Sequence, residues 1–274
     1  MFSAVLEKAV VGPLESRSTP FDSFPFEPYQ NKSEAMMPFL FDPFMLLLVP
    51  PMILAFYARS KVQSTFKEYS GRMASSGVSG FEAAKRILRS NGLEDVDIER
   101  VSGNLSDHYD PRDRTLRLSE NVYGSQSLAA LGVAAHEAGH AVQDKGGYLP
   151  LKIRKGIWPV ASFGSNLGPI VFFIGLVMMF FTGGGGELAK LVAQAGILLF
   201  AAGAFFSIVT LPVEFNASKR ALAMLTDEGI VTARERDDAK KVLNAAALTY
   251  LASAFMALMM LLRFILLFMA VGDE

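Results

Sequence analysis

The sequence predicts a mainly α-helical membrane protein with about four transmembrane helices and a small α+β soluble domain. Hydrophobic residues make up 51% of the 274 residues, and the mean hydropathy of +0.31 is high for a soluble domain of this length. Four segments are long and apolar enough to cross a bilayer, which takes about 20 residues. Between the first two of them, the polar stretch at residues 58–156 is long enough to build a small domain.

Long apolar segments supply the four predicted spans, at residues 38–57, 157–181, 188–213 and 245–271. The first contains four prolines, which predicts a kinked or partly interfacial helix. A buried helix of a soluble domain is the alternative for this segment. The second and third spans contain several glycines, which favour close contact between helices in lipid.

The soluble stretches are predicted to lie on one side of the membrane, residues 58–156 as a domain and residues 214–244 as a short helical insert. Basic residues such as Arg59 and Lys152 crowd their membrane ends, whereas the loop at residues 182–187 has none. Because Lys and Arg are enriched in cytoplasmic loops, both stretches are predicted to face the cytoplasm from a multi-pass protein of the plasma membrane.

Composition excludes several kinds of site, and the N-terminal stretch differs from the rest of the chain. The net charge of −1 lacks the basic surplus that nucleic-acid binding needs. Without cysteine, the chain can form neither disulfides nor thiolate metal sites. Residues 1–35 combine Pro, Ser and Phe without helical or strand periodicity, which predicts a flexible N-terminal extension.

Within residues 58–156, the pattern predicts a helix, two strands and a second helix. Ser79 and Glu82 have the spacing of a capping box for a helix at residues 81–90. Residues 96–101 and 114–119 alternate in strand fashion. The linker between the two strands contains an Asp-Pro pair and is predicted as a turn.

The second helix carries the run AAHEAGHAV at residues 134–142, which contains an H-E-x-x-H pattern. On a helix, His136 and His140 lie one turn apart on one face, so both imidazoles can reach one metal ion. Glu137 is offset from them and can take a proton from a metal-bound water, which is the arrangement of a zinc hydrolase. The alternative is a chance match on a buried alanine-rich helix, which would still have to satisfy two imidazoles and a carboxylate.

A catalytic zinc ion takes three protein ligands and keeps one position open. No histidine follows His140, so the third ligand is predicted to be a carboxylate. Glu214 is the leading candidate, because two predicted spans separate it from His140 and return it to the same side of the membrane. The alternatives are that Glu214 is only a charged helix-end residue and that Asp227 or Glu120 faces the histidines.

Both motifs carry a family resemblance. HEAGHAVQ, followed by two spans and PVEFNASKRAL, resembles the YugP-type bacterial membrane zinc metallopeptidases, from about residue 38 to the C-terminus. The layout also resembles that of the HtpX membrane proteases. The resemblance implies zinc bound by His136, His140 and Glu214, with Glu137 as the general base. Where the HtpX-like relatives have an aspartate that orients a ligand histidine, this chain has Ser218, which offers only a weaker, uncharged hydrogen bond.

The sequence thus predicts a membrane-embedded zinc endopeptidase with a zincin-like peptidase domain, acting on protein or peptide substrates at the cytoplasmic surface of the lipid bilayer. The strand just before the motif helix is the edge along which such a peptidase aligns an extended peptide. Candidates for stabilising the oxyanion are Arg220, Tyr148, Tyr123 and His108, the last of which is otherwise a turn residue.

Two other classes are consistent with parts of the pattern. A non-enzymatic membrane scaffold with a structural metal would need a fourth protein ligand, for which His108 is the only histidine left. A transporter needs ionisable residues near the membrane midplane. Arg263 is the only charged residue clearly inside the predicted spans.

Overall fold

A computed structural model describes residues 42–103, 106–183 and 186–272. The predicted extension at residues 1–35 and the start of the first predicted span lie outside the described residues. From Pro43 onward the chain forms one compact unit. Four of its helices are long and apolar enough to cross a membrane. With a small three-stranded mixed sheet, they confirm the predicted mainly helical fold.

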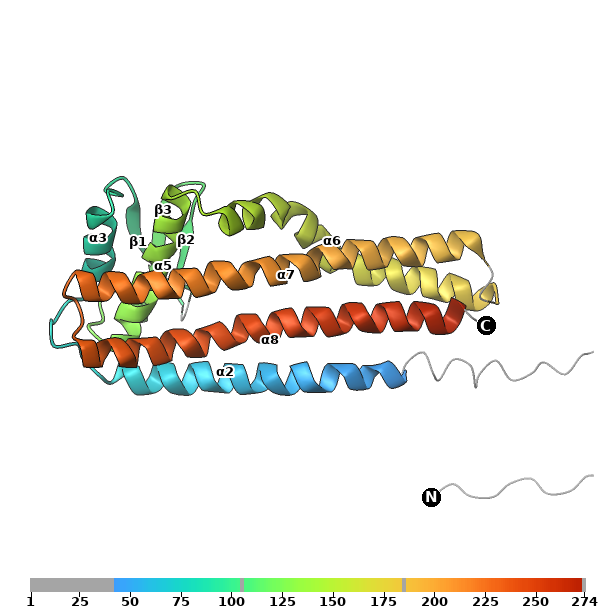
Figure 1. Ribbon diagram of the computed structural model, residues 1–274, viewed down its shortest axis with the longest axis horizontal. Coiled ribbons are helices and arrows are strands. Elements are labelled where there is room, and N and C mark those ends of the chain that lie inside the picture. Colours follow the sequence, from blue (N-terminus) through green and yellow to red (C-terminus); the bar gives the residue numbers. More distant parts are fainter. Residues whose placement is uncertain (1–41, 104–105, 184–185, 273–274) are drawn as a thin grey trace, which may run out of the picture. The chain divides into compact units, whose positions relative to one another are not determined.

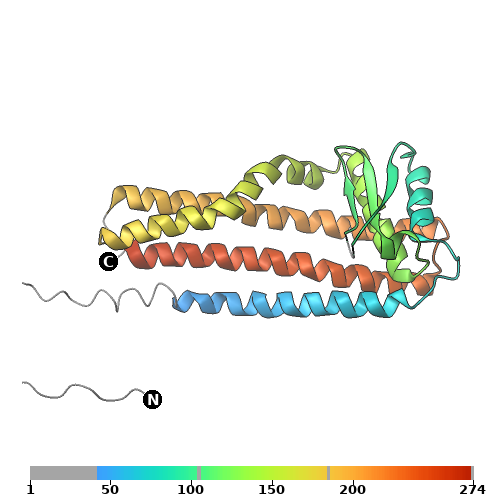
Figure 2. The same ribbon diagram turned by 180° about the vertical axis from the view of Figure 1, so that it is seen from behind.

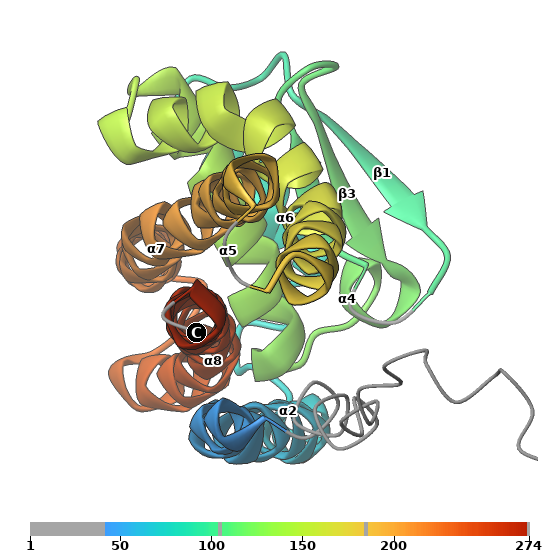
Figure 3. The same cartoon turned by 90° about the vertical axis from the view of Figure 1, so that its right-hand side faces the viewer.

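The long helices make up most of this unit. They are α2 (Val49–Ser70), which follows the short 3₁₀ helix η1 (Pro43–Leu48), α6 (Leu149–Phe181), α7 (Glu187–Asp227) and α8 (Ala233–Gly272). Helices α2, α8 and α7 lie side by side along their length (Figures 1 and 2), with α8 in the middle in the end-on view (Figure 3). Two prolines of the first predicted span fall in the first turn of α2, where a missing N–H breaks no helical hydrogen bond.

Helices α7 and α8 extend well beyond the predicted spans, so the predicted insert at residues 214–244 consists of their ends joined by a short turn. No proline or glycine interrupts residues 214–227, and the helix continues through them. Gly229, with a φ of +60°, allows the chain to turn. Thr232 and Glu235 then form reciprocal hydrogen bonds of the capping-box type at the start of α8.

A small domain gathers at one end of the long helices (Figures 1 and 2). Its elements are α3 (Gly80–Ser90), β1 (Asp97–Val101), β2 (His108–Asp110), β3 (Thr115–Ser119), α4 (Glu120–Tyr123) and α5 (Leu128–Lys145). The predicted capping box of Ser79 and Glu82 is present at the start of α3. Apolar side chains of α3, β3, α5 and the end of α7 form one core, including Ile87, Leu118, Leu131 and Leu225.

The sheet contains a strand that the sequence pattern misses. Strand β2 lies in the linker predicted as a turn, and its three residues are too few to show a period. The order is β1-β3-β2, with β1 parallel and β2 antiparallel to β3. Strand β2 is therefore an edge strand of the described sheet. The expectation that the strand just before the motif helix is an edge is wrong, because that strand, β3, pairs on both sides and is the central one.

Glycines let α6 and α7 approach very closely in the second half of α6. A Cβ on Gly164 would overlap the carbonyl oxygen of Leu199, and a Cβ on Gly196 would overlap the backbone of Phe172. Such contacts between backbones are typical of helices that pack in lipid. No hydrophobic effect drives helices together there, and small residues allow the close van der Waals packing that does.

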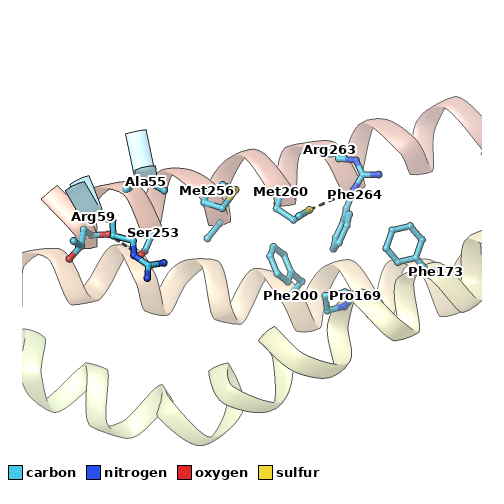
Figure 4. A pocket seen from close by; sticks show the side chains of 13 residues that line it. Ala55, Arg59, Pro169, Phe173, Phe200, Ser253, Met256, Met260, Arg263 and Phe264 are labelled. Carbon is cyan, nitrogen blue, oxygen red and sulfur yellow. Dashed lines mark hydrogen bonds between the residues drawn. The ribbon is translucent and has the colours of Figure 1, made fainter. Parts of the chain in front are cut away.

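An apolar crevice of about 560 Å³ lies between α2, α6, α7 and α8. Figure 4 shows Phe200 and Phe264 on its walls, with Arg59 near one end. Arg263 also lines the crevice and is only 8% exposed, so this charge of the fourth predicted span is buried among the helices. The largely apolar walls agree with the assignment of these helices as candidate spans.

Candidate metal centre

Helix α5 carries the H-E-x-x-H pattern. Its N-terminus is capped by Ser127, whose hydroxyl accepts a hydrogen bond from the Ala130 N–H at 3.2 Å. Small residues cover much of its buried surface, and a Cβ on Gly139 would lie only 3.0 Å from the Ala217 carbonyl oxygen. Helices α5 and α7 therefore cross closely enough for their polar side chains to meet.

At this crossing the structure brings together His136, His140 and Glu214. The Glu214 Oε2 atom lies 3.1 Å from His136 Nε2 and 3.5 Å from His140 Nε2. In the part of the chain that the structure describes, these three residues form the one group whose ligand atoms all lie within 4.8 Å of one another. The alternative carboxylates lie elsewhere, since Glu120 pairs with an arginine at 3.3 Å and Asp227 ends α7.

Each imidazole has a second partner that leaves its Nε2 atom directed at Glu214. The Nδ1 atom of His136 lies 3.1 Å from the Ser218 hydroxyl. The Nδ1 atom of His140 donates to Gln143 Oε1 at 3.0 Å. Gln143 is fully buried, and its amide donates to the Val213 carbonyl at 2.8 Å. The same NH₂ group also donates to Asn216 Oδ1 at 3.0 Å, so both of its donors are used. Gln143 therefore presents its oxygen to His140, which assigns the proton to Nδ1 and leaves Nε2 free.

The electrostatics favour a positive charge between the histidines and the carboxylate. Burial disfavours the charged form of His140, but the hydrogen bond with Glu214 and the negative charges of Glu137 and Glu214 outweigh it and raise the pKa of His140. Glu214 is only 2% exposed. A buried carboxylate needs such a compensating cation, and two neutral imidazoles with one carboxylate are a donor set that suits Zn²⁺.

A cavity of about 270 Å³ opens beside these residues, between β2 on one side and the first turns of α6 on the other. Glu137 lines it next to His140 and Glu214. His108 of β2 lines it as well, with its Nδ1 atom 2.9 Å from the Ser106 carbonyl oxygen. The open space next to the three candidate ligands leaves room for water and substrate.

One residue of α5, Asp144, forms hydrogen bonds with both walls of the cavity, β2 and the start of α6. Asp144 accepts a hydrogen bond from the Tyr109 hydroxyl of β2 at 3.3 Å and from Lys155 Nζ of α6 at 2.6 Å. Burial, together with the charge and hydrogen bond of Asp144, raises the pKa of Tyr109 to about 12, so this phenol stays protonated as a donor. Helix α5 thus positions both walls as well as the two candidate histidine ligands.

Three of the predicted oxyanion candidates are engaged outside the cavity. Arg220 Nε donates to Asn216 Oδ1 at 2.8 Å. The hydroxyl of Tyr148 points to the Pro212 carbonyl oxygen at 3.4 Å, and the ring of Tyr123 stacks on that of a phenylalanine in α3. Of the predicted candidates, His108 is the one that lines the cavity.

Sequence reasoning missed Gln143, Arg154 and Tyr250. Gln143 follows His140 by three residues and therefore lies on the same face of α5, a spacing that could have identified it. Arg154 Nη1 lies 2.8 Å from Glu214 Oε1, although the sequence shows it only as one of several basic residues near a membrane end. Tyr250 of α8 lines the cavity from inside the fourth predicted span, where an aromatic residue gives no signal.

Comparison with known proteins agrees with this geometry. Residues 44–269 match the family described as "Putative neutral zinc metallopeptidase". The chain is 46% identical over 231 residues to the "Putative membrane protease YugP" of Bacillus subtilis (strain 168). The aligned region covers 84% of this chain and 99% of that protein. No solved structure matches the chain.

Proposed function

This chain belongs to that family of neutral zinc metallopeptidases, and on this premise we propose that it is a membrane-embedded endopeptidase that hydrolyses peptide bonds of proteins at the cytoplasmic membrane surface. The observation that carries the proposal is the convergence of His136, His140 and Glu214 beside an open cavity that Glu137 lines. Metal-dependent peptide hydrolysis uses a Lewis acid, a base and room for the substrate, and the cavity offers a place for each.

The donor set supports a catalytic rather than a structural metal. His136, His140 and Glu214 would hold the ion, which when bound supplies a Lewis acid that polarises the scissile carbonyl and lowers the pKa of water. A scaffold with a closed metal site needs a fourth protein ligand. Among the described residues, the group contains three.

Glu137 is proposed as the general base. It follows His136 on α5 but points into the cavity, so its carboxylate can take a proton from water without occupying a metal position. Ser218 and Gln143 keep the two imidazoles oriented, as ligand histidines generally require.

Strand β2 is proposed to align the substrate. It pairs with β3 on one side only, and residues of β2 line the cavity, so an extended peptide can add to its free edge next to Glu137. For the negative charge that develops on the substrate carbonyl oxygen, the proposed hydrogen-bond donors are His108 and Tyr250, which both line the cavity.

The decisive experiment is Glu137→Gln. The ligands remain while proton abstraction is lost, so the variant should retain zinc and lose about 100-fold or more in hydrolysis. Zinc content and cleavage of casein or a peptide are measured in detergent, with Glu228→Gln, outside the cavity, as the matched control. A Glu137→Gln protein that cleaves at nearly the wild-type rate would contradict the assignment.

A further inference from the structure

Helix α6 has two halves of very different packing. In residues 149–160, which we call the α6 arm, Leu151 is the one buried residue and most side chains are exposed. After Gly164, the helix packs against α7 with backbones in contact. Figure 1 shows the arm leaving α7 near the small domain, whereas the second half of α6 runs along it. The arm is therefore held to the rest of the protein by few contacts.

One of these contacts ends on a candidate metal ligand. Arg154 Nη1 of the arm lies 2.8 Å from Glu214 Oε1. The other carboxylate oxygen, Oε2, is the one that faces both imidazoles, 3.1 Å from His136 Nε2 and 3.5 Å from His140 Nε2. Thus Oε1 of Glu214 contacts an arginine, while Oε2 faces the two histidines.

We propose that Arg154 is a positioning residue that reserves Oε1 of Glu214, so that this carboxylate can bind a metal through Oε2 alone. The inference rests on the proposed function. Carboxylates bind metals through one oxygen or through both, and a second bound oxygen would occupy the position that a catalytic zinc must leave open. A charge-assisted hydrogen bond to a side chain that is 2% exposed opposes rotation of the carboxylate toward two-oxygen binding.

The burial of Glu214 makes this restraint effective. With Arg154 removed, Oε1 would lose its charged partner, and neither water in the cavity nor the neutral hydroxyl of Tyr250 would replace that charge. A bound metal ion would then be the nearest cation that Oε1 can bind. The position for water and substrate would then be filled by the protein itself. Arg154 therefore protects the open position rather than adding a ligand.

The test uses the full chain in detergent with cobalt(II) in place of zinc, because four-coordinate cobalt absorbs visible light more strongly than five-coordinate cobalt. Arg154→Met should weaken this absorption and lower kcat by about 10- to 100-fold, while the protein still binds one zinc as tightly as wild type or more tightly. Arg154→Lys, which retains a charged donor, should restore part of the absorption and of kcat. Lys152→Met, an exposed change on the same arm that does not line the cavity, should match wild type in both.

Two results would overturn the inference, and a third would overturn the proposed function. Equal cobalt spectra for Arg154→Met and wild type would show that Arg154 does not control coordination. Loss of metal from Arg154→Met and Arg154→Lys would show that the arginine is needed for binding as such. A wild-type protein that binds neither cobalt nor zinc would instead refute the proposed function, so the two failures can be told apart.

Discussion

At the residue scale, the two histidines of the proposed zinc site are oriented by uncharged partners. A serine hydroxyl contacts His136 and a glutamine amide oxygen accepts from His140, at 3.1 and 3.0 Å. A carboxylate in place of either partner would make the histidine it contacts more basic, and that histidine would then bind a metal more tightly. Neutral partners hold the imidazoles in place but leave more positive charge on the metal, which favours polarisation of a substrate carbonyl.

Glu214 provides a residue-scale prediction of its own. Glu214→Ala should lower zinc affinity about tenfold or more, because it removes the third donor and leaves two histidines. Glu228→Ala, one residue past the end of the same helix, should leave zinc affinity unchanged. Titration with a zinc-competing chelator measures both. Equal affinities for the two variants would mean that Glu214 is not a ligand.

The sequence could predict those site residues whose positions along the chain form a recognisable spacing. His136, Glu137 and His140 form a local pattern, and Glu214 could be inferred because a count of spans returns it to the same side of the membrane. Arg154 and Tyr250 could not be found in this way, because their relation to the site depends on how α6 and α8 pack. Strand β2 was missed because three residues in a turn-forming linker have no detectable period.

At the element scale, α6 combines a loosely held arm with a tightly packed second half, and the two halves contain glycines in opposite surroundings. The Cα of Gly164 faces the backbone of α7, whereas a Cβ on Gly156 would have no heavy atom of another segment within 4 Å. The same substitution should therefore have opposite effects at the two positions.

Gly164→Ala should destabilise the protein by about 1–3 kcal/mol, because the added methyl overlaps the Leu199 carbonyl oxygen and forces α6 from α7. Gly156→Ala should instead stabilise it by about 0.5–1 kcal/mol, because alanine favours the helix more than glycine does. Thermal unfolding in detergent measures the difference. If Gly164→Ala unfolds at or above the wild-type temperature, the close contact between the two helices is not as described.

At the scale of the whole molecule, the long helices connect the small domain to the opposite end of the bundle. The end of α6 and the start of α7 lie at that far end, while the turn between α7 and α8 lies next to the small domain (Figure 1). The distribution of Lys and Arg favours the cytoplasm for the small domain.

The orientation is testable with reporter fusions. A reporter that works outside the cytoplasm should be active when joined at Gly183, and one that works inside it should be active when joined at Gly229, because more basic residues flank the second position than the first. Paired enzymatic reporters, each active on one side only, distinguish the cases. The reverse pattern would place the proposed site outside and change the class of accessible substrates.

The length of α7 also predicts how deep the proposed site lies in the membrane. From Glu187 to Glu214 the helix advances 27 residues, or about 40 Å at 1.5 Å per residue, close to the thickness of a bilayer with its headgroups. With Glu187 at the far surface, Glu214 comes to lie level with the near headgroups. We therefore expect scissile bonds within a few residues of a substrate's own membrane boundary, and mass spectrometry of the cleavage products would locate them. Cuts confined to the centre of a hydrophobic span, or to loops far from the membrane, would be inconsistent with this depth.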